Sequence, residues 1–64
     1  MTESFWQRLL RTFLGMDVRL QLRGDRELVG TLEHLADDSC RVKTEDGKLV
    51  QVDYFDLRGC EAAK

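Results

Sequence analysis

The hydrophobic residues at the start of the chain recur at the spacing of an α-helix. They repeat at intervals of four positions, with polar residues on the opposite face: Phe5, Trp6, Leu9, Leu10, Phe13 and Leu14. Ser4 followed by Gln7 is typical of a helix N-terminus, and Gly15 is typical of the residue just past a helix end. The pattern therefore predicts an amphipathic helix over residues 4–14.

Beyond Gly15, hydrophobic and polar residues alternate, which is the period of a half-buried β-strand. Val18, Leu20 and Leu22 begin this pattern, and further segments follow at residues 27–35, 40–43 and 48–53. Residues 55–60 are interpreted as a fifth strand, or as a helical turn followed by a strand, and residues 61–64 as a frayed tail. We therefore expect one mainly β domain, with an N-terminal helix and five antiparallel strands over residues 16–60.

Two glycines indicate how the strands are shaped. Gly30 interrupts the second strand, where a glycine commonly marks a sharp bend. We expect the bent strands to form a small barrel with four residues in its interior: Leu20, Leu28, Leu32 and Val42. Asp46 and Gly47 predict a tight type I′ hairpin turn, in which both central residues have positive φ.

The predicted helix carries two large apolar residues in its first turn. Its apolar face is expected to cover one open end of the barrel, although a partner-binding or a membrane-surface helix is also consistent with the pattern. Two arginines, Arg8 and Arg11, are few for a membrane anchor. Phe5 and Trp6 are hard to bury together under one barrel, which makes them candidates for contact with a partner or a neighbouring subunit.

A chain of 64 residues has a thin stability margin, because a domain of about this size buries only about 60% of the surface that its unfolded form exposes. With Cys40, Cys60 and His34 as its only cysteines and histidine, one chain cannot assemble a four-ligand zinc site. No cofactor or metal is therefore expected. The sequence allows a disulfide between Cys40 and Cys60. Because no secretory signal is readable, however, we expect reduced thiols and a cytoplasmic protein. Oligomerisation through edge strands is the expected stabiliser.

Charge is distributed unevenly along the chain. Residues 1–26 hold five arginines and three acidic residues, whereas residues 27–64 hold five basic and nine acidic residues, for a total of −2. General nucleic-acid binders are basic, because phosphate neutralisation supplies most of their non-specific affinity. The composition therefore argues against charge-driven binding to DNA or RNA at large and allows a localised site.

Two known families resemble this sequence. Residues 18–32, with Gly24, Gly30 and Leu32, resemble the first motif of Sm, LSm and Hfq proteins, and Leu57-Arg58-Gly59 resembles their second motif. That resemblance implies a helix on five bent strands, a ring of identical subunits and recognition of single-stranded RNA by loops around the pore. Residues 13–20, 30–42 and 52–57 are similar to the C-terminal domain of the ribosome maturation factor RimP, another small SH3-like barrel.

The Sm resemblance implies candidate RNA contacts in two loops. Arg58, beside Gly59, matches an arginine whose guanidinium stacks on a base and contacts phosphate. The loop before the third strand, from Asp37 through Ser39 to Cys40, matches the loop that reads bases, but Ser39 and Cys40 replace its Met and Asn. The alternative interpretation of Arg58 is a surface arginine paired with an acidic residue such as Asp56.

An active site is not expected, since one histidine, one tyrosine and no embedded carboxylate pair leave few groups for catalysis. The leading hypothesis is an Sm-like protein that forms a homo-oligomeric ring and binds single-stranded RNA. The alternative is an SH3-type adaptor resembling the RimP C-terminal domain, with a ribosomal or other ribonucleoprotein partner. Neither hypothesis involves a membrane.

Overall fold

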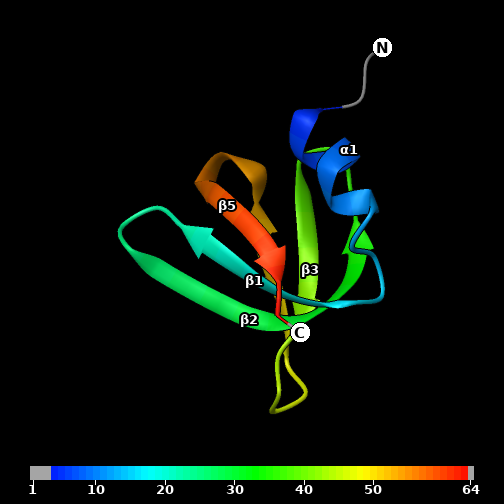
Figure 1. The fold of residues 1–64 in the computed structure, drawn as a ribbon, viewed down its shortest axis with the longest axis vertical. Helices are drawn as coiled ribbons and strands as arrows, with labels where there is room; N and C mark the ends of the chain where they lie inside the picture. Colours follow the sequence, from blue (N-terminus) through cyan, green and yellow to red (C-terminus); the bar gives the residue numbers. More distant parts are fainter. Residues whose placement is uncertain (1–3, 64) are drawn as a thin grey trace.

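The computed structural model describes residues 4–63 and shows one short helix followed by a single antiparallel sheet (Figure 1). The elements are α1 (Phe5–Arg11), β1 (Asp17–Leu22), β2 (Arg26–Leu35), β3 (Ser39–Lys43), β4 (Leu49–Asp53), the 3-10 helix η1 (Tyr54–Asp56) and β5 (Leu57–Ala62). The strands lie in the order β4-β3-β2-β1-β5, and every neighbouring pair is antiparallel. The prediction of a mainly β chain with an N-terminal helix and five antiparallel strands is confirmed.

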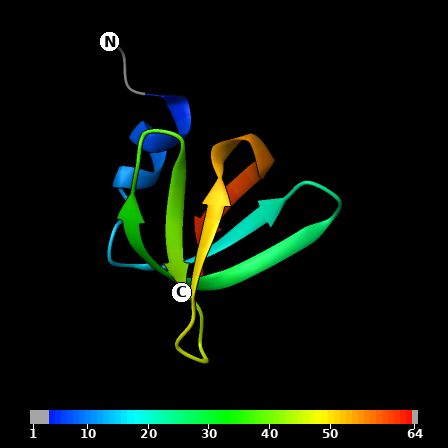
Figure 2. The ribbon, with the colours of Figure 1, turned by 180° about the vertical axis from the view of Figure 1, so that it is seen from behind.

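The sheet is strongly bent along β2, which pairs with β1 through its first half and with β3 through its second half (Figures 1 and 2). Within residues 4–63, β4 pairs only with β3 and β5 only with β1, so the sheet is not closed into a barrel by pairing between β4 and β5. The expected five strands are thus present as one open, curved sheet with two free edges.

Gly30 lies where β2 bends toward β3. A Cβ atom at this position would lie 2.7 Å from Val42 Cγ1 and closer still to the carbonyl oxygen of Lys43. Only a residue without a side chain fits this approach of one backbone to another. The proposed role of Gly30 in the bend is therefore supported by the packing around it.

A β-bulge at Glu33 changes which side chains of β2 face the core. Leu32 pairs with Val42, but the next partner of β3, Arg41, pairs with His34, so Glu33 is the extra residue. A bulge of this kind shifts the alternation by one position. In consequence His34 is exposed and Leu35 packs against the core.

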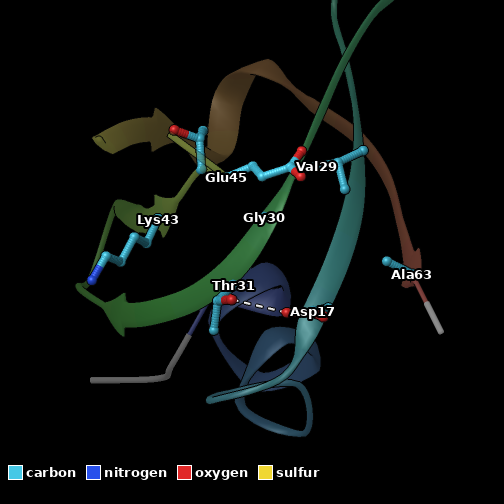
Figure 3. A pocket seen from close by; sticks show the side chains of 8 residues that line it. Asp17, Val29, Gly30, Thr31, Lys43, Glu45 and Ala63 are labelled. Carbon is cyan, nitrogen blue, oxygen red and sulfur yellow. Dashed lines mark hydrogen bonds between the residues drawn. The ribbon is translucent and has the colours of Figure 1, made fainter. Parts of the chain in front are cut away.

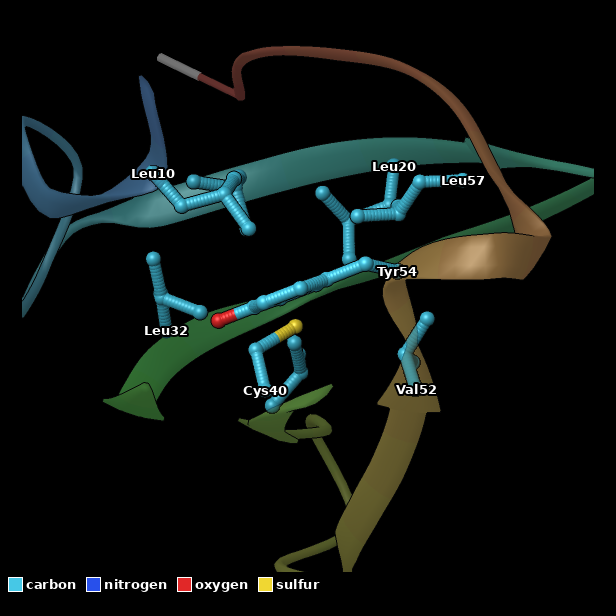
Figure 4. Close-up of a cluster of buried hydrophobic side chains, with 9 residues drawn as sticks. Leu10, Leu20, Leu32, Cys40, Val52, Tyr54 and Leu57 are labelled. Atoms are coloured by element: carbon cyan, nitrogen blue, oxygen red, sulfur yellow. The ribbon is translucent and has the colours of Figure 1, made fainter. Parts of the chain in front are cut away.

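The core lies in the concavity of the bent sheet, beneath α1. Its buried residues come from the helix, from all five strands and from η1: Leu10, Val18, Leu20, Leu32, Cys40, Val42, Val52, Tyr54 and Leu57. Figure 4 shows the Tyr54 ring in the middle of this cluster. Leu20, Leu32 and Val42 form the predicted interior, whereas Leu28 is only partly buried against it.

The helix is shorter than the predicted 4–14, because it begins at Phe5 and ends at Arg11. Its N-terminus is as expected, since the Gln7 N–H donates to Ser4 Oγ at 3.0 Å. At the other end, turns replace the predicted last helical residues and lead to Gly15, which has φ of +85°. The Gly15 N–H donates to the Leu32 carbonyl at 2.7 Å. Because this N–H is bonded to β2, it does not extend the hydrogen bonding of the helix.

Two further predictions need correction. The predicted tail 61–64 is wrong at residues 61 and 62, because β5 continues to Ala62 along β1, while Lys64 lies outside the described residues. The type I′ turn is also wrong, since only Gly47 has positive φ (+88°) and the Gly47 N–H donates to the Thr44 carbonyl at 2.9 Å. The hairpin loop is therefore longer than two residues and contains one glycine in the left-handed region. Asp46 keeps a negative φ and is not strained.

Candidate functional site

The structure brings the β2–β3 loop and η1 together at one end of the sheet. The Tyr54 N–H donates to the Asp38 carbonyl at 3.0 Å, and the Tyr54 hydroxyl donates to the Ala36 carbonyl at 2.6 Å. Tyr54 is buried, so these bonds fix the loop on the core. The β2–β3 loop is therefore fixed against η1, whereas Arg58 and Gly59 lie in the strand β5 that follows η1 and not in a loop.

Ser39 and Cys40, two of the predicted RNA contacts, are buried at the start of β3. Their relative exposures are only 6% and 1%, so neither side chain is accessible to a base in this conformation. Burial raises the pKa of the Cys40 thiol to about 11, with a smaller contribution from the neighbouring Cys60, and this keeps Cys40 neutral. Asp37, in the turn before β3, is exposed.

Arg58 occupies a distinct backbone position, as the extra residue of a β-bulge. Gln21 pairs with Gly59 and Leu22 with Leu57, which leaves Arg58 without a partner on β1. Its side chain is exposed and makes no ion pair with any residue of the described range 4–63. Of the alternative interpretation, a surface arginine paired with an acidic residue such as Asp56, the exposed position is observed but the ion pair is not, because Asp56 pairs with Arg23.

Arg23, just after β1, and Phe55, in η1, form a second exposed feature. The Arg23 guanidinium carbon lies 4.2 Å from the centroid of the Phe55 ring, and Phe55 as a residue is 76% exposed. Arg23 also holds η1, because its Nε lies 3.7 Å from Asp56 Oδ1 and its backbone N–H donates to the Asp56 carbonyl at 2.8 Å.

Arg23 and Phe55 were not predicted as functional residues from the sequence. They lie 32 residues apart, and they meet only because β5 pairs with β1. Only one feature of the sequence pointed to Phe55. It is a large apolar residue at a position where the alternation of hydrophobic and polar residues did not predict burial. No comparable signal marked Arg23.

Phe5 and Trp6 behave differently on α1, as expected from their adjacency. Phe5 is 71% exposed, whereas Trp6 is partly buried and packs against the core. Their rings make an edge contact, with centroids 5.4 Å apart and planes at 75°. Only Phe5 therefore offers most of its ring to a partner.

A pocket of about 610 Å³ lies at the end of the sheet near the β3–β4 hairpin (Figure 3). Its lining comes from β1, β2, the hairpin and the C-terminal end: Asp17, Val29, Gly30, Thr31, Lys43, Thr44, Glu45 and Ala63. The Thr31 hydroxyl donates to Asp17 Oδ1 at 2.8 Å. Lys43 is directed away from the centre of the pocket in Figure 3, so no cationic group points into it.

Within residues 4–63, no three His, Cys, Asp or Glu side chains are grouped as metal ligands would be. None of the helices in this range has the length and apolar character needed to cross a bilayer. In comparisons with known proteins, no family model, no curated protein and no solved structure matches this chain.

Proposed function

We propose that the chain is an Sm-like protein, a small open barrel whose copies assemble into a ring that binds single-stranded RNA. The strand order β4-β3-β2-β1-β5, with a bend in the second strand and a helix on the core, supports this assignment. Arg58 is the chief RNA contact, with Gly59 and the exposed Asp37 loop beside it. Ser39 and Cys40 support the fold of this loop and do not contact RNA.

The two free edges of the sheet are the observation that carries the proposal. β4 and β5 each present one row of backbone groups with no strand partner in the described part of the chain. No proline occurs in the chain to block them. Because the free edges belong to different strands, pairing β4 of one copy with β5 of the next is head-to-tail, and it gives a ring when the rotation between copies divides a full turn.

Arg58 suits RNA because its guanidinium is exposed and makes no ion pair within residues 4–63. Guanidinium groups stack on bases and donate to phosphate oxygens in a planar fork. The chain as a whole has a net charge of −2, which limits non-specific attraction to duplexes. Affinity is therefore expected to be concentrated at this site.

The experiment combines solution mass with RNA titration. Size-exclusion chromatography with light scattering is expected to show a pentamer to heptamer, and labelled oligo-U or oligo-A is expected to bind at low salt. Arg58→Ala is expected to weaken binding. It is also expected to reduce the slope of log binding constant against log salt concentration by about 0.7 for each subunit that contacts a phosphate. Arg41→Ala, which removes another exposed arginine, on β3, is the matched control. A monomer that binds neither oligonucleotide would overturn the proposal.

The second candidate is an SH3-type adaptor resembling the RimP C-terminal domain, acting in ribosome or ribonucleoprotein assembly. The observation that favours it is the apolar surface of α1, where Phe5 and Leu9 are exposed one helical turn apart. This candidate predicts a monomer or dimer. It also predicts that Phe5→Ala weakens co-sedimentation with ribosomal particles while Phe55→Ala does not.

A further inference from the structure

We infer that the Phe55 ring, held by Arg23, is a stacking platform for an unpaired base of the RNA strand that Arg58 contacts. This inference rests on the proposed function. In addition to the charged Arg58, the uncharged Phe55 then contributes to the affinity for RNA. Phe55 is the most exposed of the large hydrophobic residues described here, at 76%. Exposed aromatic rings are the usual partners of bases in single-stranded nucleic acids, because every base has a π-face.

The platform is ordered before any ligand arrives. Besides the contact between its guanidinium and the ring, Arg23 donates from Nη2 to the Phe55 carbonyl at 3.2 Å. Its backbone N–H donates to the Asp56 carbonyl at 2.8 Å. Backbone and side chain therefore tie the end of β1 to η1, and a base that stacks there loses little affinity to ordering of the protein.

Arg58 lies close enough for one RNA strand to engage both residues. Three peptide units separate Phe55 from Arg58, so their Cα atoms are no more than about 11 Å apart. One face of the ring is occupied by the guanidinium of Arg23, and most of its surface is open to solvent. A base can stack on the ring while a neighbouring phosphate meets Arg58.

The surroundings of Phe55 favour a base over a protein partner. The other exposed large hydrophobic residues belong to α1 and the turn after it, to β2 or to β4: Phe5, Leu9, Leu14, Met16, Val29 and Leu49. Around Phe55 lie charged side chains, namely Arg23 and Asp56. A protein-docking surface needs a contiguous apolar patch, whereas a single ring between charged groups suits one base.

The test is fluorescence anisotropy with end-labelled oligo-U and oligo-A, titrated with the wild-type chain, Phe55→Ala, Phe55→Tyr and Leu14→Ala. Phe55→Ala is expected to weaken binding roughly 5- to 150-fold for both oligonucleotides, with an unchanged salt slope. Phe55→Tyr, which keeps the ring, is expected to bind within about threefold of wild type. Leu14→Ala removes an exposed apolar side chain from the turn after α1, where no RNA contact is proposed, and is expected to leave affinity unchanged.

Three results would overturn the inference, and the first two separate it from the proposed function. If wild type binds RNA and Phe55→Ala binds equally well, the stacking role is wrong and the Sm-like proposal stands. If Phe55→Ala changes the solution mass, the ring contacts another subunit and not a base. If wild type binds neither oligonucleotide, both proposals fail together.

Discussion

Replacing Gly30 by alanine tests whether the bend in β2 depends on the missing side chain. The new Cβ would lie 2.7 Å from Val42 Cγ1 and 3.0 Å from the carbonyl carbon of Lys43, with the carbonyl oxygen nearer still. Lys43 pairs with Thr31 in the β2–β3 ladder. Relief of the clash therefore requires movement of β3 backbone that holds the sheet together.

The size of the effect follows from overpacking. Inserting a methyl group into a packed site typically costs about 1–3 kcal/mol, and we expect about 2–3 kcal/mol here because backbone must move. A 64-residue domain has roughly 3–10 kcal/mol of stability in total. With about 4–8 °C of melting temperature per kcal/mol in a domain of this size, Gly30→Ala should melt roughly 10–20 °C lower than wild type.

The assay is thermal unfolding followed by circular dichroism, at one protein concentration because assembly shifts the midpoint. Gly59→Ala is the matched control, since its Cβ would meet only Gln21 Oε1, at 2.9 Å, at the end of a flexible side chain. That variant is expected to melt within about 4 °C of wild type. Equal melting temperatures for Gly30→Ala and Gly59→Ala would refute the explanation of the bend.

Three other predictions concern stability. Ser4→Ala removes the acceptor for the Gln7 N–H and should lower the free energy of unfolding by about 1 kcal/mol in urea denaturation. Tyr54→Phe leaves the Ala36 carbonyl without its 2.6 Å donor and should cost about 1–2 kcal/mol by the same assay; no loss would show that the bond is dispensable. Burial raises the pKa of Cys40 from 9.0 to about 11, so the unfolded chain ionises first. Stability should therefore be full below pH 9 and fall toward pH 11, and Cys40→Ala should reduce that dependence on pH.

Much of the fold was predictable from side-chain periodicity alone. The change of period near Gly15 located the boundary between helix and sheet, because a helix and a strand place successive side chains differently. Boundaries were less predictable. The helix ends at Arg11 because the following residues turn toward β2, and β5 extends to Ala62 because β1 offers a partner along its length.

The candidate site was predictable only in part. Arg58 was identified from its place in a motif, and its exposure and lack of an ion pair within residues 4–63 came from the structure. Ser39 and Cys40 were placed among the RNA contacts by position in the same way, yet both are buried. A motif gives the position of a residue in the chain but not the side of the strand on which its side chain lies.

The sequence by itself determined the element types and the helix N-cap at Ser4, because each depends on neighbouring residues. It marked Gly30 as a bend, but the approach of Val42 and Lys43 that excludes a side chain there belongs to the tertiary structure. The tertiary structure decided the bulges at Glu33 and Arg58, the two free edges and the meeting of Arg23 with Phe55. These features depend on which strands lie side by side. Periodicity along one strand carries no information about its neighbour.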